Sequence, residues 1–253
     1  MVIGNKILYQ KSCKSSLDWA KSNIETAGDG TVFLTDFIEN AKGRGNRVWQ
    51  CFEGQAILTI LLKPQITYID ESDLENKINS LTMAFSLGVV NALQEHNIKI
   101  KWPNDFMLNN KKLGGMLVEI VWEKNLPKAI IIGIALNINN SFPPNDELYK
   151  IATSLKDLLN KIFDLKTIID NCLCEIDKLY SAWKDKKFDL IYKNWKTKQL
   201  YLNQKIKVHQ NDGSFVEGIA KDFATNGDLI LTDENNNEQR ISFYQVENVE
   251  LRR

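Results

Sequence analysis

The chain has 253 residues, which is long enough for a sizeable hydrophobic core and for two domains. Its apolar share of 43% and charged share of 25% are ordinary for a soluble globular protein. Basic and acidic residues number 32 each, so no overall positive field would draw the chain to nucleic acid or to an anionic membrane. We therefore expect neither as a partner.

The N-terminal segment and the cysteines favour a reduced, cytoplasmic protein. Residues 1–16 are polar and lack the apolar core of a signal peptide. The longest apolar run, residues 129–138, is far shorter than the roughly 20 residues that a membrane helix needs. The four cysteines form no C-x-x-C pair and the chain has only two histidines, so we expect no structural zinc site.

The first third of the chain predicts strands between two helices. Ser15 or Ser16 can cap a short helix. The β-branched and aromatic runs at 31–37 and 55–62 predict strands. Apolar residues at helical spacing predict a longer helix over 74–96.

The middle of the chain predicts a hairpin followed by a buried strand. A strand at 98–102 leads into arms at 105–108 and 112–122, which turn at Asn109-Asn110. The continuous apolar run 129–138 fits a strand buried on both faces.

The pattern changes after about residue 200. Helical spacing over 172–195 gives way to short strand-like runs separated by Asn, Asp and Gly. These runs are 205–209, 215–221, 229–232, 239–243 and 246–251. A β module of this size has little core of its own, so we expect it to pack on the larger domain. The predicted domains are 1–199 and 200–253.

The first candidate for a functional site is the segment 43–49. Gly43 permits close backbone approach to a ligand, Arg44 and Arg47 supply forked donors for phosphate or carboxylate, and Trp49 offers a flat apolar surface. Such a loop can fold over an anionic ligand. A solvated basic loop is the alternative, because short Gly/Arg stretches are common.

The second candidate is Lys-Trp-Pro-Asn-Asp at 101–105. The proline ends the strand, so Asn104 and Asp105 leave the sheet with a fixed direction. A carboxylate held at a strand end can orient an amine or accept its proton. An ordinary Pro-Asn-Asp turn is the alternative.

Two further candidates lie on apolar strands. Gly114-Gly115, just after Lys112, predicts a bulge or a place where a ligand approaches the backbone. Asn137 ends the apolar run that also contains Gly133, and its buried amide needs partners. A nucleotide is one such partner, and a satisfied core asparagine is the commoner case.

Together these segments resemble the biotin–protein ligase family. The strongest match is Lys-Trp-Pro-Asn-Asp at 101–105, followed at 112–119 by Lys-Leu-Gly-Gly-Met-Leu-Val-Glu. Gly133 and Asn137 fit the family's G-x-G-x-N element, and residues 152–155 fit its A-T-S-L. The resemblance covers nearly the whole chain.

The resemblance implies an α+β fold. It comprises a mixed sheet flanked by helices, the class II synthetase-like catalytic fold of biotin and lipoate ligases, with a small C-terminal SH3-like β-barrel. Because no helix-turn-helix region precedes the catalytic part, the chain resembles the single-function class.

The implied activity is a ligase that forms biotinyl-5'-AMP from ATP and biotin, with Mg²⁺, and transfers biotin to a lysine of a carrier protein of the acetyl-CoA carboxylase type. The implied catalytic residues are Lys112, Asp105 and Arg44. The implied biotin-binding residues are Ser15, Ser16, Lys42, Gly43, Arg44, Lys112, Gly115 and Gly133. The implied ATP-binding residues are Arg44, Arg47, Trp49, Asn104, Lys112 and Asn137. No protein ligand for a metal is assigned.

The chain departs from the family pattern around the expected biotin pocket. Leu17 stands for an asparagine, Ile38 for a glutamine and Lys42 for an arginine, while Ala41 and Ala135 stand for glycines. Two alternatives stay open. One is a lipoate–protein ligase, which shares the catalytic fold and chemistry of the family. The other, motivated by these departures, is a homologue that binds biotin or a carrier without catalysis. Pairing of two copies through a sheet edge is a further hypothesis.

Overall fold

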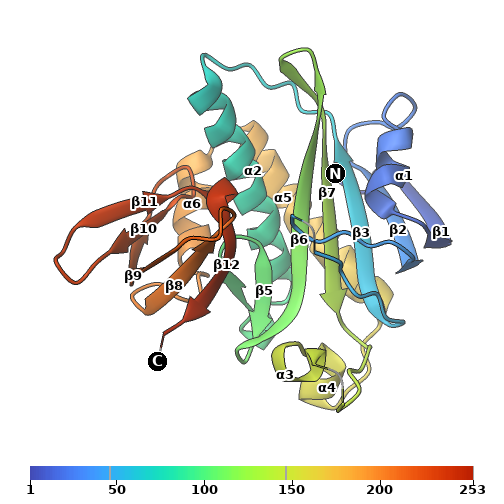
Figure 1. The fold of residues 1–253 in the computed structure, drawn as a ribbon. Helices are drawn as coiled ribbons and strands as arrows, with labels where there is room; N and C mark the ends of the chain where they lie inside the picture. The colour runs from blue at the N-terminus through green and yellow to red at the C-terminus, as the bar shows by residue number, and fades with distance from the viewer. Residues whose placement is uncertain (46, 146, 253) are drawn as a thin grey trace.

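The computed structural model describes all residues except 46, 146 and 253. The described residues form two β-sheets and the helices packed around them (Figure 1). Asn46, within the predicted glycine–arginine loop, lies outside the described residues. None of the described helices is both long and apolar enough to cross a membrane.

The larger sheet has seven strands and is mixed, as predicted. Its first two strands pair in parallel, and the other neighbours pair antiparallel. The strand order is β1 (Ile7–Cys13), β2 (Thr31–Ile38), β3 (Gln55–Leu62), β7 (Leu126–Asn137), β6 (Lys111–Glu123), β5 (Asp105–Leu108) and β4 (Lys99–Lys101). The turn between β5 and β6 has positive φ at Asn109 and Asn110, which asparagine tolerates, so the predicted hairpin is confirmed.

Helices cover the two faces of this sheet unequally. On one face, alternate strand residues such as Ile60 and Ile132 join the main core with α2 (Glu71–Ala92), α5 (Leu165–Lys184) and α6 (Phe188–Lys196). On the other face, Leu61 and Ile131 pack against the short helix α1 (Ser16–Ser22), whose N-cap is Ser15. Because α1 is short, part of this face of the sheet stays uncovered, and the candidate functional site lies there.

The remaining short elements differ in part from the sequence predictions. The predicted helix 74–96 is α2 followed by the 3₁₀ turn η1 (Gln94–His96). The helices α3 (Leu148–Ile151) and α4 (Leu155–Leu159) were not predicted. Strand β1 was not predicted either, because it is a mostly exposed edge strand without a continuous apolar run.

The C-terminal residues form a separate five-stranded antiparallel sheet, as predicted. The strand order is β11 (Glu238–Ile241), β10 (Leu229–Thr232), β9 (Phe215–Phe223), β8 (Lys205–Gln210) and β12 (Val246–Leu251). The predicted strand 239–243 ends earlier, because η2 (Phe243–Gln245) follows it. The domain boundary at residues 199 and 200 stays a prediction.

Specific contacts hold the C-terminal sheet against the larger one. The indole Nε1 of Trp102 donates to the carbonyl of Gly227 at 2.9 Å, and Lys101 Nζ donates to Asn248 Oδ1 at 3.1 Å. Lys101 is the last residue of strand β4, and Trp102 follows it directly. The predicted packing of the β module on the larger domain is therefore confirmed, and it brings β12 beside the Lys-Trp-Pro-Asn-Asp segment.

Candidate active site

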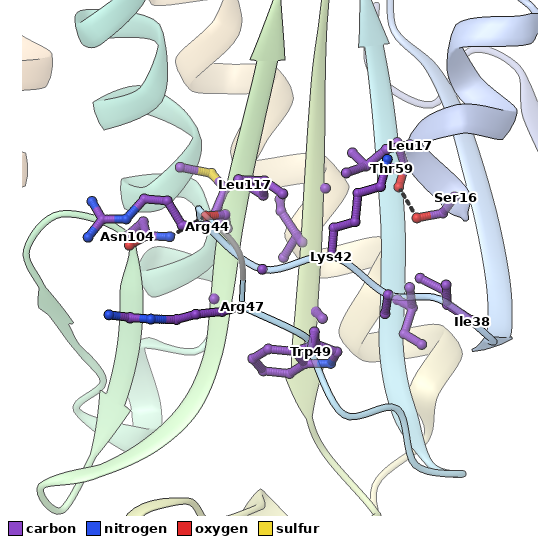
Figure 2. Close-up of a pocket in the computed structure, with 18 of the residues that line it drawn as sticks. Ser16, Leu17, Ile38, Lys42, Arg44, Arg47, Trp49, Thr59, Asn104 and Leu117 are labelled. Atoms are coloured by element: carbon purple, nitrogen blue, oxygen red, sulfur yellow. Dashed lines mark hydrogen bonds between the residues drawn. The ribbon is translucent and has the colours of Figure 1, made fainter. Parts of the chain in front are cut away.

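The uncovered face of the larger sheet holds a cavity lined by nearly all the predicted site residues (Figure 2). Three positions that point to this face, Gly115, Gly133 and Ala135, carry little or no side chain, which leaves room above the strands. The predicted site residues that line it are Ser15, Ser16, Lys42, Gly43, Arg44, Arg47, Trp49, Asn104, Asp105, Lys112, Gly115 and Gly133.

One end of the cavity, which we call the charged end, is built around Lys112 and Asp105. Strands β5 and β6 are neighbours, and Lys112 Nζ lies 2.6 Å from Asp105 Oδ1. A Cβ atom at Gly115 would lie 3.5 Å from that carboxylate oxygen, so the glycine keeps the space over the pair open. The Lys112 ammonium also lies 5.5 Å from the centre of the Trp49 ring. An ammonium and a carboxylate are thus held together at the cavity wall.

Arg44 adds an unsatisfied donor to the charged end. Its Nη2 donates to the carbonyl of Glu247 at 2.9 Å, while its buried Nη1 has no hydrogen-bond partner in the part of the chain that the structure describes. Burial lowers the pKa of Arg44 to about 10, so the guanidinium stays charged at neutral pH. A buried charged donor without an acceptor is costly, and an anionic ligand would supply one.

The loop that carries Arg44 is held by its own backbone and by the C-terminal sheet. Gly43 N donates to the Arg47 carbonyl at 2.8 Å, and Trp49 N donates to the carbonyl of Ala41 at 2.9 Å. Arg47 Nη2 donates to the carbonyl of Glu247, on β12, at 2.8 Å. These contacts hold the loop against the C-terminal sheet, while about half of the Arg47 side chain stays exposed.

Asn104 links the strand end to its neighbour. Its Nδ2 donates to the carbonyl of Met116 at 2.7 Å, and Met116 N donates back to the Asn104 carbonyl at 3.0 Å. The side chain therefore fixes the position of the segment that carries Asp105.

The opposite end of the cavity, which we call the hydroxyl end, is built around two hydroxyl side chains, and the ammonium of Lys42, another lining residue, pairs there with Asp18 of α1. Thr59 Oγ1 donates to Ser16 Oγ at 2.8 Å, and both residues are buried. Leu17, Ile38 and Ile57 form the aliphatic wall beside them. Figure 2 shows Ser16, Leu17, Thr59 and Ile38 on the side of the cavity away from Asn104 and Arg44, and the Lys42 side chain extends toward Leu17 and Thr59.

Two of the predicted biotin-binding residues make contacts that explain their positions. Ser15 Oγ accepts from Asp18 N at 3.2 Å and so caps α1. Lys42 Nζ lies 3.3 Å from Asp18 Oδ2, with half of its side chain exposed, so it stands at the rim.

Asn137 is the one predicted site residue that does not line this cavity. It is buried, its Oδ1 accepts from Gln55 Nε2 at 2.7 Å, and its Nδ2 donates to the carbonyl of Lys112 at 3.5 Å. These contacts are those of a satisfied core asparagine that supports the backbone of Lys112. Its contact with a nucleotide stays a prediction.

Several residues at the site were not identified from the sequence. Thr59 was visible as a polar residue inside the apolar run 55–62, and such residues need a partner. The sequence does not point to Glu247, because its backbone carbonyl accepts hydrogen bonds from arginines that lie about two hundred residues away.

The chain matches known proteins along most of its length. The model of the biotin/lipoate A/B protein ligase family matches residues 9–137. The bifunctional ligase/repressor BirA of Bacillus subtilis is 30% identical over 225 residues, which cover 85% of this chain and 66% of that protein. The biotin–[acetyl-CoA-carboxylase] ligase of Mycobacterium tuberculosis is 24% identical over 204 residues, covering 80% of this chain and 73% of the relative.

The fold is also shared with a solved enzyme. The biotin protein ligase from Aquifex aeolicus, in complex with biotin and ATP, superposes with a TM-score of 0.82 at 23% identity, covering 98% of this chain and all of that one. This chain spans slightly less than two thirds of the Bacillus relative. On the family match and the shared fold, the chain belongs to the biotin/lipoate A/B protein ligase family.

Proposed function

We propose that this chain is a biotin–protein ligase, which joins biotin to AMP and then passes the biotinyl group to a lysine of a carrier protein. The observation that carries the proposal is the charged end of the cavity. There, the paired Lys112 and Asp105 lie beside Arg44, whose buried Nη1 has no hydrogen-bond partner among the described residues. The names of the relatives and the biotin and ATP bound to the Aquifex enzyme support the choice of substrates.

In the first half-reaction, a biotin carboxylate oxygen attacks the α-phosphorus of ATP. A new O–P bond forms and the bond to pyrophosphate breaks. Lys112 Nζ would leave Asp105 to contact the carboxylate and the α-phosphate, and Arg44 Nη1 would donate to a phosphate oxygen. Since negative charge grows on the phosphate oxygens, cations positioned at this end of the cavity would lower the barrier.

In the second half-reaction, the carrier lysine attacks the acyl carbonyl and AMP leaves. A lysine with a pKa near 10.4 is almost fully protonated at pH 7, and freeing its amine costs about 4–5 kcal/mol. Once Lys112 turns to the acyl phosphate, Asp105 would have an oxygen available for that ammonium. The carboxylate would orient the amine and help to remove its proton.

We also propose that Mg²⁺ binds together with the nucleotide. Among the residues described, no group of three or more His, Cys, Asp or Glu side chains could hold a metal ion. The ion would therefore be held chiefly by the phosphates and water, which suits its preference for oxygen ligands, and would screen the charge of pyrophosphate.

The partner and compartment follow from the same proposal. A biotin carboxyl-carrier protein or domain of the acetyl-CoA carboxylase type would supply the lysine, as the name of the Mycobacterium relative suggests. Cys13, Cys51, Cys172 and Cys174 are all free thiols, which is compatible with a reduced cytoplasm.

Incubation of the full chain with biotin, MgATP and a biotin carboxyl-carrier domain tests the proposal. We expect intact-mass spectrometry to find one biotinyl group on one carrier lysine, dependent on ATP. A carrier whose lysine is replaced by arginine is the control. No modification by a folded protein that binds both substrates would contradict the proposal.

A further inference from the structure

A second cavity lies at the end of β3, away from the candidate active site. It is enclosed by the connection between β3 and α2 and by the segment that runs from the end of α5 to the start of α6, and its volume is about 490 Å³. Tyr180 and Trp183 of α5 line it, and both belong to the core on the face of the sheet opposite α1. None of its lining residues lines the cavity that holds Lys112 and Asp105, so the two cavities are separate.

Positive charge predominates in this second cavity, which we call the lysine cavity. Its charged lining residues are Lys63, Lys77, Lys184, Lys186 and Asp29. The oxygens of Asp29, the one carboxylate among them, are engaged by neutral donors. The hydroxyl of Tyr180 lies 3.1 Å from Oδ1 and 3.0 Å from Oδ2, and the backbone N of Lys63 donates to Oδ1 at 2.9 Å.

The acidic side chains near these lysines are already paired. The pairs are Asp73 with Lys77 at 2.7 Å, Asp185 with Lys187 at 2.9 Å, and Glu25 with Lys128 at 2.7 Å. Among the described residues, Lys63, Lys184 and Lys186 therefore form no ion pair. Three ammonium groups less the one carboxylate of Asp29 leave an excess of two positive charges in the lining.

The floor of the lysine cavity is aromatic. Tyr180 and Trp183 are at most 6% exposed, and their rings stack with centroids 5.9 Å apart. Trp183 Nε1 donates to Ser80 Oγ at 2.9 Å, and the Tyr180 hydroxyl donates to Asp29, so the polar atoms of both rings are paired. Lys184 Nζ lies 4.9 Å from the centre of the Tyr180 ring, which places a cation beside this floor. A planar or apolar group would suit such a surface.

We propose that the lysine cavity binds an organic phosphate, a small molecule that carries two or more negative charges on a planar or apolar body. This goes beyond the proposed ligase function and does not depend on it. Lysine ammonium groups bind phosphate oxygens as point charges, and a doubly charged anion matches the excess in the lining. Small-molecule pockets enclose about 300–1,000 Å³, so a phosphate ion alone would leave most of this cavity unfilled.

Differential acetylation of lysines, read by mass spectrometry on the full chain, tests the position of the site. Adenosine 3',5'-bisphosphate is the probe, inorganic pyrophosphate supplies charge without the body, and adenosine supplies the body without charge. At ten times its Kd the bisphosphate should slow acetylation of Lys63, Lys184 and Lys186 about tenfold, because about one site in eleven is then empty. Lys112 reports on the catalytic cavity in the same digest, and the exposed Lys221 is the reference.

Isothermal titration calorimetry of two double variants tests the chemistry. Lys184→Gln combined with Lys186→Gln should weaken binding of the bisphosphate about 10²-fold, about tenfold for each charge. Glutamine at position 186, where φ is 60°, meets the same backbone strain as lysine, so the fold should be kept. Lys150→Gln combined with Lys221→Gln removes the same charge at exposed positions outside the cavity and should leave Kd unchanged.

The inference has clear points of failure. Protection of Lys112 alone, or an affinity unchanged by the Lys184→Gln and Lys186→Gln pair, would overturn it, because the probe would then occupy the catalytic cavity only. Protection of no lysine by any probe would overturn it as well. Equal affinity for pyrophosphate or for adenosine would contradict a ligand that joins charge to an organic body. All these outcomes leave the ligase function standing, because the lysine cavity contains none of its residues.

Discussion

The two ends of the cavity are built from different parts of the chain and by different chemistry. The charged end combines the β5–β6 hairpin, the arginine loop and a carbonyl of the C-terminal strand β12. The hydroxyl end combines α1 with β3 and β7 and carries the Ser16–Thr59 pair beside an aliphatic wall. We therefore expect that adenylate formation and recognition of the acyl ring can be altered separately, since the two ends are built on different elements.

The largest expected effect is at the charged end, for Lys112→Ala. Removing the ammonium that meets carboxylate and phosphate should slow single-turnover formation of the acyl adenylate about 10³-fold with every acid tested. Rapid quenching and chromatography of the adenylate measure it. The matched control is Lys111→Ala, because Lys111 contacts Tyr149 outside the cavity and its loss should have little effect. Equal losses in the two variants would argue against the assigned position of the chemistry.

Arg44→Ala should rank second. Loss of the Nη1 donor, which has no partner in the described part of the chain, should lower the rate of adenylate formation about 10²-fold, and the loss should again be the same for biotin and octanoate. Arg240→Ala, on the far strand β11 and paired with Asp228, is the control. A loss confined to biotin would mean that Arg44 serves acyl recognition and would remove the distinction between the two ends.

Asp105→Asn should separate the half-reactions. We expect transfer of the acyl group to a carrier lysine to fall about 10²-fold, with a smaller change in adenylate formation. The transfer rate is measured from preformed adenylate, so that the loss of the ion pair with Lys112 does not enter. Hydroxylamine, which is unprotonated at neutral pH, serves as a second acceptor. If Asp105→Asn slows the acylation of hydroxylamine as much as that of lysine, the carboxylate does not act on the lysine ammonium.

The smallest effect should come from Thr59→Val, measured as stability. Losing one buried hydroxyl hydrogen bond should lower the free energy of unfolding by about 1 kcal/mol in urea denaturation. Ser16→Ala should cost a similar amount, and the double variant less than the sum. Strict additivity would show that the two hydroxyls do not act as a pair.

The sequence predicted the charged end better than the hydroxyl end. Lys112, Asp105 and the arginine loop stand in long ordered motifs whose spacing is a strong signal. Ser16, on helix α1, was predicted, but its partner Thr59 lies 43 residues away on strand β3, and only the tertiary fold brings them together. The contact of β12 with the arginine loop is likewise a tertiary one, so the periodicity and turn residues of the sequence cannot predict it.

The same distinction applies to the fold. Strands β3 and β10 match their predicted bounds, because each is a continuous β-branched or apolar run between turn residues. Strand β1 is held by pairing with β2 and exposes most of its side chains, so its own residues give no clear pattern.

The central claim is that the charged end joins a carboxylic acid to AMP. Biotin-dependent exchange of labelled pyrophosphate into ATP by the wild-type chain tests it most directly. We predict exchange that requires biotin or another fitting acid and that collapses in Lys112→Ala. Failure of the folded wild-type chain to exchange with any acid, while it still binds biotin, would contradict the account.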